Sequence, residues 1–344
     1  MGTLQTFPTY NPGDHYVRDI PFKAHKIVGI SPELLEGLYE NIYGGAIRCL
    51  NDVETMIAAY SKDTPWSTNI ERLKSQELQL VNEIILHEIY FDSIGEDGGE
   101  VLDDQTLESA LLASFGSITK WQTIFTAMAL ATQNGSTQSK FVGNGWVVLA
   151  WSNRQRRLIN IASNKASETL VDAHPILVLN INEDAYALDY GSDRKSYVDA
   201  FMNNIQWGCV AHRFTQTINH QAINKRQKEK SPDVADGHIS VKELKGLVDC
   251  GDDSYTVIDV RHDDDRKRYR FRIMETDFRD SFNVKSWTSE IPRGKLVVVY
   301  CMYGFWVSQK VAEELRAQGV NALSLSGGVT AWRAMGFLTT ENEF

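Results

Sequence analysis

The first part of the chain shows apolar residues at helical spacing. Ser31 followed by Pro32 predicts a helix start, because serine caps a helix well and proline fits the first helical position. The apolar pattern then continues to about residue 60, and a second apolar stripe predicts a helix over about residues 75–93. The glycine pair at 44–45 falls inside the first pattern and indicates close packing or a kink.

The next segment mixes helical and strand-like patterns. Helical spacing recurs at 103–116 and 117–131, and a third helix is predicted over 194–214. Between them lie three apolar, β-branched runs typical of short strands, at 145–151, 157–163 and 175–181. We therefore expect a helical hairpin at 22–95, followed at 96–215 by helices flanking a small antiparallel sheet.

A polar stretch at 216–237 predicts a linker, and a different pattern follows it. Ser240 and Glu243 have the spacing of a capping box at a helix start. Strand-like runs then alternate with helical ones, which is typical of a parallel sheet. Residues 238–344 are thus predicted to form a separate α/β domain.

Charge and composition exclude several functions. The 344 residues carry a formal net charge of -10, which argues against a general nucleic-acid-binding surface. We expect no membrane segment and no targeting peptide, because the sequence has neither an apolar run long enough to span a bilayer nor a leader pattern. Four scattered cysteines fit the cytoplasm or another reducing intracellular compartment. Of these, three are predicted to be small buried hydrophobes, namely Cys49, Cys209 and Cys250.

Three segments of the first part carry a family resemblance. "LHEIYF", "GNGWVVLAW" and "NINEDAYALDYG" occur in this order, and the last is similar to the motif D-x-W-E-H-A-Y-x-x-D-Y. Residues 22–215 thereby resemble the iron/manganese superoxide dismutase family. The resemblance implies an α+β fold and one Fe or Mn ion, held by three His and one Asp, that dismutes superoxide.

The ligand positions implied by this resemblance are largely altered. They correspond to Leu38, His87, Asn180 and Asp184, of which His87 alone keeps the family's residue. Leucine has no lone pair to donate, and an amide oxygen is a weak ligand for Fe or Mn. The second-sphere tyrosine and glutamine positions hold Ala46 and Val142. We expect the metal site to be lost, with no cofactor beyond residual Fe or Mn at low occupancy, and His87 to be a core histidine.

The same resemblance implies a homodimer, which the sequence puts in doubt. In the family, the Glu of the E-H pair reaches across the two-fold interface to a ligand His of the partner. Here the pair is Glu183-Asp184, so this geometry would bring two carboxylates together. We expect the dimer to be absent, or retained with one carboxylate protonated.

The C-terminal part carries a second resemblance. "DVR" at 259–261, "VVYC" at 298–301 and "SGGVTAW" at 326–332 are together similar to a single rhodanese domain, over about residues 238–338. The resemblance implies that Cys301 accepts sulfane sulfur as a persulfide. The pattern supports this independently, because a thiol between a parallel strand and a helix N-terminus faces backbone N–H groups that stabilise a thiolate or persulfide.

The loop "CMYGFW" has the length typical of sulfurtransferases but an unusual chemistry. Its pocket residues are Met302, Tyr303, Gly304, Phe305 and Trp306. Family members often carry Arg or another polar residue at the last two positions, so the loop lacks a side-chain partner for an anion. Cys301 is thus either a reactive persulfide-accepting thiol or an inert relic. Asp259 and Arg261 are predicted to support the loop as a structural pair.

These patterns lead to three hypotheses about function. The first is a non-dismutating dismutase-like/rhodanese fusion that acts as a sulfurtransferase or persulfide carrier through Cys301. The second is a catalytically inactive structural or protein-interaction subunit of a larger assembly. The third is a metal-dependent oxidoreductase with an altered site at His87 and Asp184. The partners expected are a protein, or a sulfur donor and acceptor.

Overall fold

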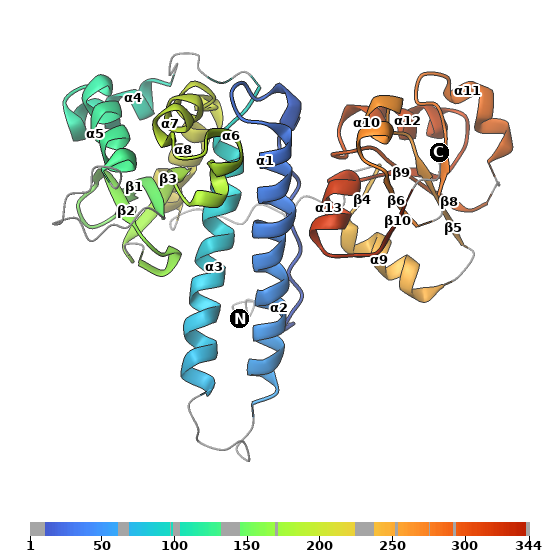
Figure 1. The fold of residues 1–344 in the computed structure, drawn as a ribbon, viewed down its shortest axis with the longest axis horizontal. Helices are drawn as coiled ribbons and strands as arrows, with labels where there is room; N and C mark the ends of the chain where they lie inside the picture. The colour runs from blue at the N-terminus through green and yellow to red at the C-terminus, as the bar shows by residue number, and fades with distance from the viewer. Residues whose placement is uncertain are drawn as a thin grey trace, which may run out of the picture.

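A helical hairpin and a small sheet form the N-terminal part of the computed structural model, and a parallel sheet forms its C-terminal part (Figure 1). Across the described residues, no helix combines the length and the apolar character that crossing a membrane requires. The structure describes residues 11–60, 69–96, 98, 104–131, 145–168, 171–223, 237–251, 254–274, 276–291 and 294–341.

The first arm of the hairpin begins at the predicted cap. The Ser31 hydroxyl accepts a hydrogen bond from the backbone N–H of Leu34 at 3.1 Å. Three stretches then follow without a break: α1 (Pro32–Gly37), a π-helical turn η2 (Leu38–Tyr43) and α2 (Gly44–Ala58). A short 3-10 turn, η1 (Ala24–Lys26), precedes them.

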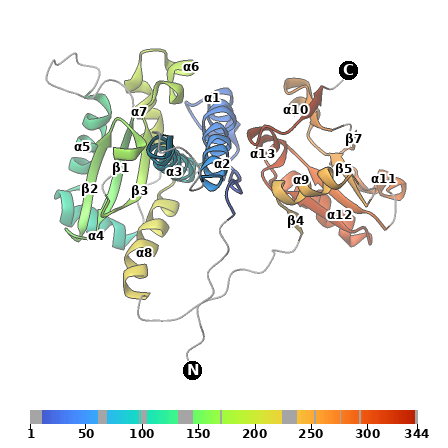
Figure 2. The ribbon, with the colours of Figure 1, turned by 90° about the horizontal axis from the view of Figure 1, so that it is seen from below.

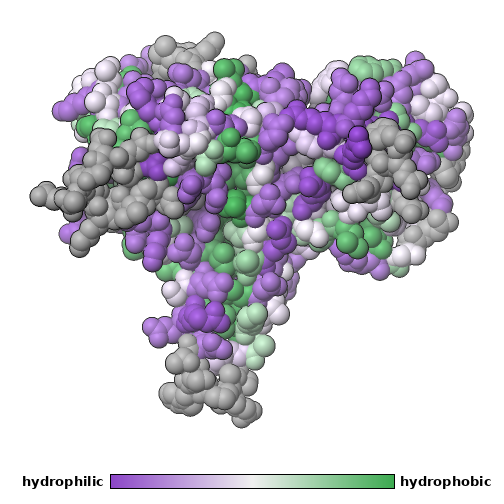
Figure 3. Space-filling view, viewed as in Figure 1, coloured by the Kyte–Doolittle hydropathy of each residue, from purple (hydrophilic) through white to green (hydrophobic). Residues whose placement is uncertain are grey.

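The second arm is α3 (Asn69–Ser93), which starts earlier than the sequence pattern predicts. Its buried side chains include Leu80, Ile84 and Tyr90, and it packs against both α2 and the sheet. The space-filling view shows an apolar strip along the hairpin (Figure 3), and exposed apolar side chains there include Leu78 and Ile85 of α3.

The sheet of the N-terminal part is antiparallel, as predicted. Its strands are β1 (Trp146–Ser152), β2 (Arg157–Ser163) and β3 (Ala173–Asn180), in the order β2-β1-β3. Trp146 pairs with Asn180, the last residue of β3. Helices and turns surround the sheet, namely α4 (Gln105–Phe115), α5 (Ile118–Leu130), η3 (Ala166–Glu168), η4 (Glu183–Ala185), α6 (Ala187–Tyr190), α7 (Arg194–Asn203) and α8 (Trp207–Ile223).

The single helix predicted over 194–214 is wrong, because α7 and α8 are separate helices. Helix α7 ends before Asn204. The side-chain amide of Asn204 donates to the carbonyl O of Val28 at 2.7 Å and accepts from the Val28 N–H at 3.2 Å. This contact with a distant segment replaces helix continuation. The linker prediction also needs correction: its residues 216–223 belong to α8, and 224–236 lie outside the described residues.

The C-terminal part contains the predicted parallel sheet, in the order β4-β9-β8-β5-β7. Ser240 and Glu243 form the capping box at the start of its first helix. A separate pair, β6 with β10, is antiparallel. In chain order the elements are β4 (His238–Ile239), α9 (Val241–Cys250), β5 (Tyr255–Asp259), α10 (Asp263–Arg268), β6 (Phe271–Ile273), β7 (Asp277–Phe278), α11 (Val284–Trp287), η5 (Thr288–Glu290), β8 (Leu296–Tyr300), α12 (Trp306–Ala317), β9 (Ala322–Leu325), α13 (Gly328–Ala334) and β10 (Thr339–Glu341).

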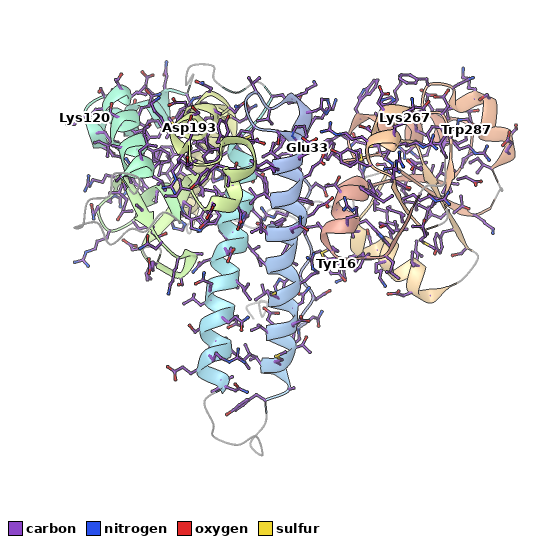
Figure 4. All side chains as sticks on the ribbon, viewed as in Figure 1. Tyr16, Glu33, Lys120, Asp193, Lys267 and Trp287 are labelled. Atoms are coloured by element: carbon purple, nitrogen blue, oxygen red, sulfur yellow. The ribbon has the colours of Figure 1, made fainter. Side chains whose placement is uncertain are left out.

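The two parts meet at α13, which contacts η2 and lies beside the hairpin arm that contains α1 and α2 (Figure 2). Gly44 lies at this contact: a Cβ built on it would stand 2.4 Å from the carbonyl O of Ala334. Close packing is thus confirmed at the first glycine of the pair, whereas Gly45 has no such neighbour. Arg333 of α13 forms an ion pair with Glu40 of η2 at 3.0 Å. Glu33 points from α1 toward the C-terminal part (Figure 4), where it pairs with Arg268. Further contacts join Asp14 with Lys242 and Glu36 with Tyr303.

The prediction that three cysteines are buried is wrong. Cys49, Cys209 and Cys250 are exposed, and of the four cysteines, all within the described residues, Cys301 alone is buried. Each exposed cysteine stands on an amphipathic helix, at a position that the burial pattern of the helix leaves to solvent.

Candidate functional site

The four positions that correspond to dismutase ligands lie on four different elements. Leu38 opens η2, His87 lies on α3, Asn180 ends β3 and Asp184 lies in η4. The first three are buried, whereas Asp184 is exposed. Leu38 belongs to the apolar core, where its side chain offers no ligand atom.

His87 and Asn180 are the two of these residues that the structure brings together. The Nδ1 atom of His87 lies 2.8 Å from the carbonyl O of Glu83, which accepts a hydrogen bond, so Nδ1 carries the proton and Nε2 keeps a lone pair. The Asn180 Oδ1 atom accepts from both N and Nδ2 of Asn182, at 2.9 and 2.8 Å. This fixes the amide orientation, and Nδ2 of Asn180 lies 3.5 Å from Nε2 of His87. An N–H group therefore faces the lone pair through which His87 would bind a metal.

Burial determines the charge state of His87. Its ring packs edge-on against the Trp146 ring, with centroids 4.9 Å apart. Burial lowers the pKa of His87 to about 4, although the hydrogen bond to Glu83 acts in the opposite direction. The imidazole is therefore neutral at physiological pH.

The remaining positions do not complete a metal site. Asp184 is exposed, whereas His87 is buried. Burial, together with the charge of Asp184, raises the pKa of Glu83. Among the described residues, no three His, Cys, Asp or Glu side chains gather as a metal site would require. Ala46 is buried in α2, and Val142 lies outside the described residues. This donor set does not fit the three-histidine, one-aspartate shell implied by the resemblance.

The second candidate site surrounds Cys301, which follows β8 and begins the loop into α12. The thiol is buried, with Sγ 3.2 Å from the Ser308 hydroxyl and 3.9 Å from the carbonyl O of Phe305. Ser308 is itself fully buried in the first turn of α12. Sequence reasoning missed Ser308, although its place in the first turn after the loop is a signal that could have identified it.

The loop after Cys301 is clamped by the "SGG" turn. Gly304 has φ +74° and Gly328 has φ +56°, and a Cβ on Gly328 would lie 2.4 Å from the carbonyl O of Cys301. The backbone N–H of Val329 donates to this carbonyl at 3.0 Å, and the Thr330 hydroxyl donates to the carbonyl O of Met302 at 2.8 Å. These contacts explain why the turn requires glycine, and they fix where Cys301 lies.

Asp259 and Arg261 form a buried ion pair behind the loop. Arg261 Nη2 lies 2.7 Å from Asp259 Oδ2, and Nε lies 3.0 Å from both carboxylate oxygens. The same guanidinium donates to the carbonyl O of Phe271 at 2.6 Å and lies 4.0 Å from Sδ of Met302. The pair is buried, so its geometry suits a supporting role beneath the loop.

A cavity of about 250 Å³ opens beside Cys301, and both parts of the chain line it. The loop itself carries no cationic side chain, as its sequence shows, but the folded cavity has Lys23 and His25 from the N-terminal part and His262 from its own domain. Sequence reasoning missed these residues, because no local pattern connects them with Cys301. The complete lining consists of Lys23, His25, His262, Asp265, Cys301, Met302, Tyr303, Phe305, Trp306 and Val307.

The loop is also tied to the hairpin. The Tyr303 hydroxyl donates a hydrogen bond to Oε1 of Glu36 in α1. Burial raises the pKa of Glu36, and hydrogen bonds from Tyr269 and Tyr303 oppose this rise. Tyr303, one of the predicted pocket residues, therefore also takes part in the contact between the C-terminal part and the hairpin.

Two family models match the chain. Residues 103–213 match the iron/manganese superoxide dismutases, C-terminal domain, and residues 240–335 match the rhodanese-like domain. The superoxide dismutase [Fe] of Cupriavidus metallidurans is 40% identical over 193 residues, which cover 56% of this chain and 92% of that relative. The superoxide dismutase [Mn] 1 of Halobacterium salinarum is 29% identical over 54% of this chain and 88% of its own length. The superoxide dismutase [Fe] of Aquifex aeolicus is 26% identical over 60% and 92%.

The matches divide the chain in the same way as the fold. The antiparallel sheet with its helices falls in the dismutase match, and the parallel sheet with Cys301 falls in the rhodanese match. High coverage of the relative at 40% identity establishes common descent for the first part. The chain belongs to the iron/manganese superoxide dismutase family and carries a rhodanese-like domain after its dismutase-like part.

Proposed function

We propose that the chain carries sulfane sulfur on Cys301 and that its dismutase-like part does not dismute superoxide. The observation that carries the proposal is the position of Cys301, buried beside a cavity with a hydroxyl 3.2 Å from its sulfur. The Ser308 hydroxyl can donate to a thiolate, and the backbone N–H groups at the start of α12 add to this stabilisation.

The chemistry is a pair of sulfur transfers with no net redox change. The Cys301 thiolate attacks the outer sulfur of a donor such as thiosulfate, whose S–S bond breaks and releases sulfite with the electron pair. A persulfide forms on Cys301. A nucleophilic acceptor such as cyanide then attacks the outer sulfur, leaves as thiocyanate and restores the thiolate.

Family membership alone favours dismutation, since relatives such as the Cupriavidus metallidurans protein are named superoxide dismutases. The altered positions argue against it here, because Leu38 offers no ligand atom and an amide N–H faces the lone pair of His87. The oxidoreductase hypothesis with His87 and Asp184 meets the same objection.

Mass spectrometry after thiosulfate treatment tests the proposal. We expect one added sulfur on wild type and on Cys209→Ser, a control that removes an exposed cysteine, and none on Cys301→Ser. Sulfur transfer from thiosulfate to cyanide should likewise occur with wild type and Cys209→Ser and be absent with Cys301→Ser. A wild type without added sulfur and without transfer would leave the structural, protein-interaction role as the better account.

A further inference from the structure

We propose that the dismutase-like part completes the rhodanese-like site by supplying Lys23 and His25 as its anion-binding side chains, which selects small sulfur oxyanions such as thiosulfate as donors. This inference rests on the proposed role of Cys301 as the sulfur acceptor.

An anionic donor that approaches a thiolate needs compensating positive charge. The loop from Cys301 to Trp306 offers backbone N–H groups but no cationic side chain. Lys310 of α12 is nearby, yet its Nζ lies over the Trp306 ring, 4.8 Å from the centroid, and the residue does not line the cavity. Besides His262, the described residues of the domain therefore contribute no basic side chain to the lining, and the remaining basic residues come from the N-terminal part.

The segment around η1 brings this charge to the cavity. Phe22 and Ala24 are buried and anchor the segment, while Lys23 between them is half-buried and lines the cavity together with His25. The backbone N–H of Lys23 donates to Glu96 Oε1 at 3.1 Å, which further fixes the turn. The backbone at Lys23 is therefore held in place by the N-terminal part, and His25, whose side chain is exposed, follows in the same turn.

The position of this segment relative to Cys301 is set by the domain contact. Tyr303, which lines the cavity, donates to Glu36, and Arg333 pairs with Glu40 at 3.0 Å. These contacts hold the two halves of the cavity together, so the binding site depends on both parts.

One acidic group shares the cavity with these cations. Burial raises the pKa of Asp265, and the charges of His262, Arg261 and His25 oppose this rise. The lining thus combines Lys23 and two imidazoles with one carboxylate. Lys23 is the lysine of this lining, and the two imidazoles line the same cavity.

The experiment uses the full chain with Lys23→Met and His25→Gln, singly and together. Lys26→Met is the matched control: Lys26 lies in the same turn, pairs with Glu96 at 2.7 Å and does not line the cavity. Lys23→Arg tests rescue by charge. Two quantities are measured. One is thiosulfate affinity in a Cys301→Ser background. The other is kcat/KM for the reaction of the Cys301 thiolate with thiosulfate, which releases sulfite, and with a neutral organic trisulfide, which releases an organic thiolate.

We expect the double variant to weaken thiosulfate binding about 10-fold or more and to lower kcat/KM for thiosulfate by a similar factor, with little change for the neutral donor. Lys26→Met should match wild type and Lys23→Arg should retain most of the affinity. Equal losses with both donors, or no loss with thiosulfate, would overturn this inference and leave the role of Cys301 intact. A wild type that accepts sulfur from neither donor would instead overturn the proposed function, and this inference with it.

Discussion

The Nδ2 atom of Asn180 lies 3.5 Å from Nε2 of His87, so an amide N–H group points at the one imidazole lone pair that the altered metal site retains. The orientation is fixed because Oδ1 of Asn180 already accepts two hydrogen bonds from Asn182. A metal ion at His87 would have to displace this amide and would find Leu38 in place of a second histidine. The contact between the two side chains is therefore a neutral polar one, in which the amide N–H faces the imidazole.

We expect the purified protein to hold less than about 0.2 equivalents of Fe or Mn, because two strong ligands are missing. Elemental analysis and a superoxide dismutation assay measure this. Leu38→His alone should not restore activity, since Asn180 and Asp184 still leave the shell wrong. The triple variant Leu38→His/Asn180→Asp/Asp184→His rebuilds the three-histidine, one-aspartate set and serves as the positive control for metal content. Stoichiometric metal in the wild type, with dismutation above the level of free ions, would refute the prediction.

The buried imidazole predicts a pH-dependent loss of stability. The pKa of His87 is about 4 in the folded protein and about 6.5 when the chain is unfolded. As pH falls from 6.5 to 4, the unfolded chain binds a proton that the folded protein does not accept, so the free energy of unfolding decreases, by about 3 kcal/mol. Buried carboxylates such as Glu83, whose pKa is raised, give the opposite slope. The comparison of wild type with His87→Gln isolates the effect.

Denaturant unfolding at pH 7 and pH 4.5 is the measurement. His87→Gln should lose less stability than wild type over this interval. Equal losses of unfolding free energy in the two proteins would show that the pKa of His87 is the same in the folded and the unfolded state.

Local signals predicted the starts of elements well. The hydrogen bonds of the Ser31 cap and of the Ser240–Glu243 capping box join residues three positions apart. A short stretch of sequence therefore contains both the donor and the acceptor. The break at Asn204 depends on Val28, a distant residue, and was missed for that reason. The cavity could not be predicted for the same reason: Lys23 and Cys301 are far apart in sequence and line one cavity only because the two parts of the chain pack together.

The sequence predicts altered ligand positions because the family resemblance assigns each of them a residue number, and for Asn180 and Asp184 the dismutase motif does so directly. The motif does not show which atom of Asn180 faces His87; that depends on Asn182, whose N–H and amide occupy Oδ1. The exposure of Cys49 and Cys209 was also missed, because the prediction followed the usual burial of cysteine and not the apolar stripe of each helix.

The Asp259–Arg261 pair predicts an asymmetric response to substitution. Arg261→Met leaves a buried carboxylate without its partner, which should cost about 3–5 kcal/mol of unfolding free energy. The double variant Asp259→Asn/Arg261→Met removes both charges and should be less destabilised than the single one. Urea unfolding of the wild type, the two single variants Arg261→Met and Asp259→Asn, and the double variant measures this. A double variant as unstable as the sum of the single ones would argue against a coupled pair.

The neighbouring glycines of α2 offer a matched test of the domain contact. A Cβ on Gly44 would lie 2.4 Å from the carbonyl O of Ala334, whereas the nearest atom to one on Gly45 is a flexible Arg48 guanidinium nitrogen at 3.8 Å. Gly45→Ala should stabilise the helix by about 0.5–1 kcal/mol. Gly44→Ala should instead destabilise the protein by about 1–3 kcal/mol and push the two parts apart. Urea unfolding and the radius of gyration from solution scattering compare them, and equal behaviour of the two variants would contradict the docking described here.

The last prediction concerns assembly. The family resemblance implies a dimer in which the Glu of the E-H pair contacts the ligand His of the partner, and here Glu183 and Asp184, both exposed, occupy these positions. Two carboxylates at hydrogen-bond distance cannot both remain ionised without cost, and the contact would occur twice per dimer. We expect the wild type to lack this dimer at pH 8, and any dimer that does form to tighten at pH 5, where one carboxylate can take up a proton. Asp184→His restores the complementary pair and should dimerise more tightly at pH 8. Sedimentation velocity on both proteins at the two pH values decides the matter, and a wild-type dimer equally tight at pH 5 and pH 8, with Glu183 at its interface, would show that the charges are accommodated in another way.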